Sequence, residues 1–136
     1  MSRVRAKGKG GWLVKILVIE ADASLGDIWC RHLERQGNDV EMASDEKTAI
    51  DKLRFSKFDV LVLDLSTKNA SVLAISDFAT YRNPDVAIIV VTANSFFSDG
   101  SIFELIPNAR GHLHTPVQPD DLAALVEHYG RGPVRA

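Results

Sequence analysis

Three polar side chains each follow an apolar run that has the length of a buried strand. Glu20 follows residues 15–19, Asp64 follows residues 58–63, and Thr92 follows residues 86–91. In an open α/β sheet the carboxyl ends of parallel strands meet at one edge, and the functional crevice lies beyond that edge. We therefore expect two carboxyl groups and one hydroxyl to converge there. Taken alone, Asp64 would more simply be a cap of the next helix.

The elements that would position these residues alternate between strand and helix patterns. Strand patterns cover residues 15–20, 38–43, 59–64, 86–92 and 111–114. Helix patterns follow each of them, with start signals at Asp22 and Asp45 and stop signals at Gly37 and Pro84. The fourth helix is the least regular and is predicted only over residues 101–106. This alternation predicts an α/β fold with a parallel sheet, right-handed crossovers and helices on both faces.

Length and composition predict one globular domain, because the 136 residues are 46% hydrophobic and 25% charged. We expect a flexible basic N-terminal tail over residues 1–13, a domain over 14–130 and a C-terminal tail over 131–136. Residues 1–15 carry five basic residues and no acid, whereas the rest carries 11 basic and 18 acidic residues. The acidic body disfavours nucleic acid as a partner, and an electrostatic role for the tail is the alternative.

No segment has the pattern of a membrane span or signal peptide, because the apolar run 12–19 is short and contains Lys15. Cys30 lies in an amphipathic helical stripe, where a lone cysteine is expected to act as a small apolar core residue. These features favour a reducing, cytoplasmic compartment.

The order and spacing of the strand ends resemble the response-regulator receiver domain (the CheY-like family) over residues 14–129. In that family the first strand ends in an acidic pair, the third in the phosphoacceptor aspartate, the fourth in Thr or Ser, and the fifth in Lys-Pro. The corresponding positions here are Glu20-Ala21-Asp22, Asp64, Thr92-Ala93 and Thr115-Pro116. The resemblance implies a (βα)5 doubly wound, flavodoxin-like fold with a five-stranded parallel sheet in the order 2-1-3-4-5.

The resemblance also implies a role for each position. Asp64 would be the phosphoacceptor, Thr92 the switch hydroxyl, and His112 the residue at the position of a rotating switch aromatic. A Mg²⁺ ion would be bound by oxygen ligands, for which the candidates are Glu20, Asp22, Asp64 and the backbone carbonyl of Ser66. The ion and a lysine would neutralise charge on the transferred phosphoryl group.

Two positions depart from the family pattern, and both departures weaken that chemistry. Ala21 stands where the second acid is expected, and Thr115 stands where the lysine is expected. A cation 4 Å from a unit charge contributes roughly 4 kcal/mol at an effective dielectric near 20. We therefore expect no cofactor, or a weakly bound Mg²⁺. Asp22 and Lys68 are the two residues that could replace the missing acid and the missing lysine.

These departures predict a stand-alone degenerate receiver, or pseudo-receiver, in two-component signalling or a phosphorelay. It would not be an enzyme and would act by protein–protein interaction, with little or no phosphotransfer. Its partner would be a histidine kinase, a phosphotransfer protein or a transcription regulator, and homodimerisation stays open. The predicted partner face comprises Phe96, Phe97, Phe103 and His112.

The main alternative is an atypical but working phosphoacceptor, phosphorylated on Asp64 by a histidine kinase or phosphotransfer protein. A flavodoxin-like cofactor binder is disfavoured, because the loop after the first strand is acidic where an anionic phosphate would bind.

Overall fold

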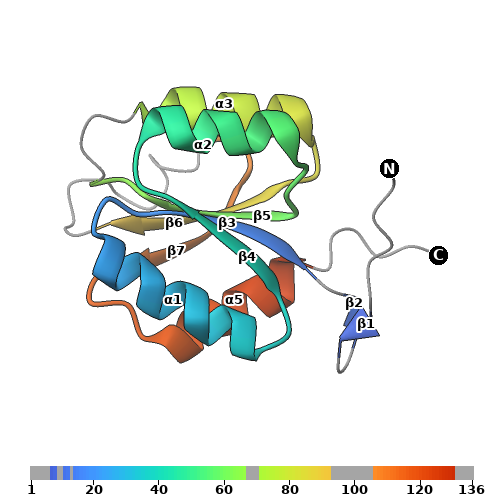
Figure 1. The fold of residues 1–136 in the computed structure, drawn as a ribbon, viewed down its shortest axis with the longest axis vertical. Helices are drawn as coiled ribbons and strands as arrows, with labels where there is room; N and C mark the ends of the chain where they lie inside the picture. The colour runs from blue at the N-terminus through green and yellow to red at the C-terminus, as the bar shows by residue number, and fades with distance from the viewer. Residues whose placement is uncertain (1–6, 9–10, 13, 67–70, 93–105, 131–136) are drawn as a thin grey trace.

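The computed structural model describes residues 7–8, 11–12, 14–66, 71–92 and 106–130. Its centre is a five-stranded parallel sheet with helices on both faces (Figure 1). The lateral order β4-β3-β5-β6-β7 is the order 2-1-3-4-5 when these five strands are counted along the chain. The predicted fold class is therefore confirmed. The strands are β3 Lys15–Ile19, β4 Asp39–Ala43, β5 Val60–Asp64, β6 Ala87–Thr92 and β7 Ala109–His114.

The described helices form two layers around the sheet. Helices α2 and α3 cover one face, and α1 and α5 cover the other (Figure 1). The predicted helix over residues 101–106 lies, apart from residue 106, outside the described residues. The bounds are α1 Ala23–Arg35, α2 Glu46–Phe55, α3 Val72–Arg82 and α5 Pro119–Gly130.

The helix boundaries follow from local chemistry. The side chain of Asp22 accepts a hydrogen bond from the Leu25 N–H at 3.1 Å and so caps the first turn of α1. Beyond the other end of α1, Gly37 adopts a φ of 95°, which side chains other than glycine rarely tolerate. Asp45 caps α2 in the same way as Asp22, by accepting from the Thr48 N–H at 2.8 Å. The predicted start and stop signals of these helices are confirmed.

The core consists of two apolar clusters, one on each face of the sheet. Leu61 and Ile88 belong to the cluster under α2 and α3, and Trp29 and Val62 belong to the cluster under α1 and α5. The central strands β3, β5 and β6 are buried on both faces, which explains their nearly continuous apolar sequences. Cys30 lies in the second cluster, where burial raises the pKa of its thiol to about 11. It is therefore a core residue, as predicted.

Strand β7 begins two residues earlier than predicted. Ala109 pairs with Ile88 and Gly111 pairs with Ile89, so Arg110 is the extra residue of a β-bulge. A bulge interrupts the alternation of side chains, which hid the start of the strand in the sequence. After the bulge, His112 and His114 lie two residues apart and share one face of the strand.

The segment predicted to be a flexible basic tail includes two short strands, β1 Lys7–Gly8 and β2 Gly11–Trp12, which pair antiparallel. Residues 131–136, predicted to be a C-terminal tail, lie outside the described part of the chain. Among the described helices, none combines the length and the apolar character needed to cross a membrane.

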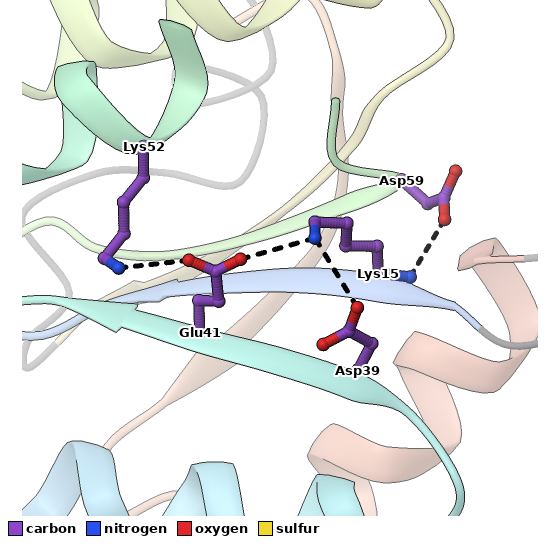
Figure 2. Close-up of polar contacts among 5 residues, drawn as sticks. All are labelled: Lys15, Asp39, Glu41, Lys52 and Asp59. Atoms are coloured by element: carbon purple, nitrogen blue, oxygen red, sulfur yellow. Dashed lines mark hydrogen bonds and ion pairs between the residues drawn. The ribbon is translucent and has the colours of Figure 1, made fainter. Parts of the chain in front are cut away.

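Charged residues form a network at the N-terminal ends of β3, β4 and β5 (Figure 2). The Lys15 Nζ lies 3.5 Å from the Asp39 carboxylate and 3.3 Å from the Glu41 carboxylate. Lys52 of α2 reaches the other oxygen of Glu41 at 3.0 Å. The backbone N–H of Lys15 donates to the Asp59 carboxylate at 2.9 Å. Acids and lysines therefore alternate through this network.

Candidate functional site

Glu20 follows β3 directly and lies at the carboxyl edge of the sheet, with 4% of its surface exposed. Its Oε2 accepts a hydrogen bond from the Asp22 N–H at 3.0 Å. Its Oε1 is buried, and no described residue donates a hydrogen bond to it. A buried carboxyl oxygen without a donor favours either a proton or a bound cation at that position.

Gly26 explains how α1 comes close enough to bury Glu20. A Cβ at position 26 would lie 3.3 Å from the Glu20 Cβ and would collide with the Sδ of Met42. Sequence reasoning missed this residue. A glycine in a helix interior is the available signal, because it weakens the helix and usually has a packing reason.

Asp64 is the last residue of β5, and only 3% of its surface is exposed. Its carboxyl group lies beside that of Glu20, as the convergence of the strand ends predicts. Burial, reinforced by the neighbouring Asp64, raises the pKa of Glu20 to about 8. Two adjacent buried carboxyl groups resist ionising together, so Glu20 tends to keep its proton near neutral pH.

Ser66 binds the carboxylate of Asp64 through two hydrogen bonds. Its hydroxyl donates to Asp64 Oδ1 at 2.7 Å, and its backbone N–H donates to the same oxygen at 2.8 Å. The sequence predicted a contribution from the Ser66 carbonyl, and the side-chain bond was missed. The signal for it is the Asp-x-Ser spacing, since an aspartate often accepts from the backbone N–H two residues later.

Thr92 and Thr115 lie at the ends of two neighbouring strands. Thr92 is the last residue of β6 and is 4% exposed. The Thr115 N–H donates to the backbone oxygen of Thr92 at 3.0 Å, so the loop after β7 is tied to the end of β6. The Thr115–Pro116 peptide is cis. The residue at the expected lysine position therefore follows the strand beside Thr92, as predicted from the order of the strands.

His112 is half-buried on β7, and its ring lies 4.5 Å, centroid to centroid, from the ring of His114. The other residues of the predicted partner face, Phe96, Phe97 and Phe103, lie outside the described residues. Lys68 lies outside them as well. The roles of these residues stay predictions.

The described side chains supply only part of the oxygen donors expected for Mg²⁺. Asp22 is exposed and one of its oxygens caps α1, while Asp64 Oδ1 already accepts two hydrogen bonds from Ser66. No group of three or more His, Cys, Asp or Glu side chains within the described ranges is arranged to hold a metal ion. Because Mg²⁺ usually keeps several waters and is bound through one or two carboxylates, Glu20 and Asp64 are the described side chains that could hold it.

The wound five-stranded sheet and the acids at its strand ends define a CheY-like receiver fold. A family model described as "Response regulator receiver domain" matches residues 16–127, which is most of the chain. The chain therefore belongs to the response regulator receiver domain family.

Known relatives agree with this assignment. The chain is 30% identical over 114 residues to "Response regulator ArlR" of Staphylococcus saprophyticus, covering 84% of this chain and 51% of the relative. It is 29% identical over 111 residues to "Response regulator MprA" of Mycobacterium tuberculosis, covering 82% and 48%. The chain thus spans about half the length of these curated relatives.

Solved structures show the same fold. A CheY-like receiver domain protein from Methanospirillum hungatei superposes with a TM-score of 0.76 at 24% identity, covering 85% of this chain and 92% of that one. A receiver domain protein from Clostridium thermocellum gives a TM-score of 0.73 at 26% identity, covering 88% and 95%.

Proposed function

We propose that this receiver domain signals by binding a partner protein, with little or no phosphoryl transfer to Asp64. It would thus be a degenerate receiver, or pseudo-receiver. The observation that supports this most strongly is the sign of the charge in the pocket. Among the described residues, the charged groups that act on the buried Glu20 are Asp64 and Asp22, which are both acidic. Thr115 occupies the position where the family carries its lysine.

The missing positive charge bears directly on the chemistry. A phosphodonor is an anion, and its approach to two adjacent buried carboxyl groups is opposed by charge repulsion. Phosphoryl transfer depends on groups that neutralise the developing charge and hold the reactants in line. The Thr115 hydroxyl offers only a neutral hydrogen bond. Transfer to Asp64 is therefore expected to be slow.

The expected weakness of Mg²⁺ binding follows from the oxygen atoms that the pocket offers. We propose that the domain works without a cofactor, or with a weakly bound Mg²⁺ held by Glu20, Asp64 and the Ser66 carbonyl. Asp22 contributes less, because its carboxylate caps α1. No step in the proposed function depends on the ion.

The proposed output is a protein–protein contact. The relatives are named response regulators, which supports a partner in two-component signalling: a histidine kinase, a phosphotransfer protein or a transcription regulator. The proposed contact face centres on His112, together with Phe96, Phe97 and Phe103.

The test is direct phosphorylation of the intact protein. The wild-type chain and Asp64→Asn are incubated with a small-molecule acyl phosphate and Mg²⁺, beside a competent receiver as the control. Intact mass spectrometry then measures addition of one phosphoryl group. We expect no Asp64-dependent adduct in the wild type when the control is fully labelled. An adduct that forms at the control's rate and disappears in Asp64→Asn would instead establish the working phosphoacceptor.

A further inference from the structure

Ser66 donates two hydrogen bonds to one carboxylate oxygen of Asp64, the candidate phosphoacceptor. The two hydrogen bonds from its hydroxyl and its N–H, 2.7 and 2.8 Å long, both end on Asp64 Oδ1. A carboxylate oxygen has about two lone-pair sites, so this oxygen is fully engaged. Hydrogen bonds to an ionised carboxylate are about twice as strong as those between neutral groups.

The backbone around Ser66 keeps this arrangement in place. The N–H of Leu65 donates to the Val91 oxygen at 2.9 Å, which extends the pairing of β5 and β6 one residue beyond Asp64. The turn to Ser66 therefore starts from a fixed point in the sheet. The Glu20 carboxyl neighbours the same side chain.

We infer that Ser66 is a positioning residue that holds the Asp64 carboxylate in an unreactive orientation. The inference rests on the proposed function. It adds a third cause of slow phosphoryl transfer to Asp64, beside the replaced lysine and the replaced acid. In transfer from an acyl phosphate, a lone pair of Asp64 forms the new O–P bond, the donor's P–O bond breaks, and the donor leaves as a carboxylate. The two bonds from Ser66 lower the nucleophilicity of Oδ1 and resist reorientation of the group. Removing the hydroxyl removes the shorter of them.

The test compares substitutions of Ser66 in a double variant that is expected to be phosphorylated. This background, Ala21→Asp with Thr115→Lys, restores the acid and the lysine of the family pattern. To it are added Ser66→Ala, which removes the hydroxyl, or Ser66→Thr, which keeps it. Ser76→Ala is the matched control, because the Ser76 hydroxyl donates to its own helix at Leu73 O, within α3. The initial rate of Asp64-dependent labelling by an acyl phosphate is measured by intact mass.

We expect Ser66→Ala to label about tenfold faster than the background, the effect of releasing one hydrogen bond from a charged group. Ser66→Thr and Ser76→Ala should label at the background rate. Ser66→Val, which keeps the shape of threonine without its hydroxyl, should label as fast as Ser66→Ala, so the valine variant separates loss of the hydrogen bond from loss of packing. Far-ultraviolet circular dichroism confirms that each variant is folded.

A second readout does not depend on labelling. If Oδ1 is released, Mg²⁺ should raise the melting temperature of the Ser66→Ala variant more than that of its background. If Ser66→Ala shows neither faster labelling nor a larger Mg²⁺ shift, the inference is overturned. The wild-type chain tests the proposed function separately: labelling of wild type as fast as the background would refute that function, while the serine comparison would still decide the role of Ser66.

Discussion

The two ends of the sheet treat partly or fully buried acids in opposite ways. At the N-terminal ends of the strands, Lys15 and Lys52 flank Glu41 (Figure 2). Burial alone would raise the pKa of Glu41, but the two ammonium groups outweigh it and hold the pKa below its ordinary value. At the carboxyl ends, Glu20 faces Asp64 and its pKa rises to about 8. The end that receiver chemistry would use is thus the end where none of the described cations neutralises the buried acids.

This difference shows that burial alone does not set the protonation state of an acidic side chain in this fold. Both glutamates belong to the same sheet, and for both, burial opposes ionisation. The sign of the neighbouring charges decides the outcome: they are acidic beside Glu20 and basic beside Glu41. Four predictions test the comparison, ordered from the largest expected effect to the smallest.

The largest effect is expected from adding positive charge to the carboxyl end. Ala21→Asp with Thr115→Lys should raise the rate of labelling by an acyl phosphate about 100-fold or more, because one nearby cation contributes roughly 4 kcal/mol. Intact mass spectrometry measures the rate, and Asp64→Asn in the same background is the control. A double variant as inert as the wild type would show that charge is not what limits the pocket.

Removing a cation from the opposite end should destabilise the fold. Lys15→Met leaves Asp39 and Glu41 without their shared ammonium, whose side chain is only 13% exposed. We expect a loss of about 2–3 kcal/mol in the free energy of unfolding, measured by urea denaturation. Lys47→Met is the control: this side chain is 87% exposed, and its ion pair with Asp51 should contribute at most about 0.5 kcal/mol. Equal losses in the two variants would contradict the network's role.

The raised pKa of Glu20 should be visible in the pH dependence of the free energy of unfolding. Its folded-state pKa lies above the unfolded value of 4.5, so between pH 4.5 and about 8 the native state binds more protons than the unfolded chain. The Glu20 contribution therefore favours folding below pH 4.5 and is lost as the pH rises to about 8. Glu20→Gln should be more stable than wild type at pH 8–9 and show a flatter profile.

Denaturation at pH 5, 7 and 9 measures this dependence. The exposed Glu34 provides the control, since Glu34→Gln removes one carboxyl group from the surface and leaves the buried pair intact. If Glu20→Gln follows the wild-type profile, the two carboxyl groups do not interact in solution.

The smallest effect is expected from Mg²⁺ itself. Because Ala21 stands where the family carries its second acid, millimolar Mg²⁺ should change the melting temperature of the wild type by no more than about 1 °C. Differential scanning fluorimetry with and without a chelator measures the shift. A rise of several degrees that disappears in Glu20→Gln would show a functional cation site.

Much of this arrangement was predictable from the sequence, because it depends on local signals and strand order. The apolar runs before Glu20, Asp64 and Thr92 located the carboxyl edge, and the caps at Asp22 and Asp45 located two helices. The start of β7 was missed because the bulge at Arg110 breaks the pattern.

Other features were missed because they depend on three-dimensional contacts. The network in Figure 2 joins Lys15 to Asp59 across 44 positions of sequence, which no local pattern encodes. The side-chain role of Ser66 depends on the turn after β5, and that of Gly26 depends on how closely α1 approaches Glu20.

The most direct test of the contrast between the two ends is a titration of both glutamates in one sample. Carboxyl carbon NMR of uniformly ¹³C-labelled protein, assigned with Glu20→Gln and Glu41→Gln, follows each group from pH 3 to pH 9. Glu20 should titrate with an apparent pKa of about 8, and Glu41 should titrate below its ordinary value. Two ordinary titrations would contradict the account, because neither the acid pair nor the lysine network would then govern the charge at its end of the sheet.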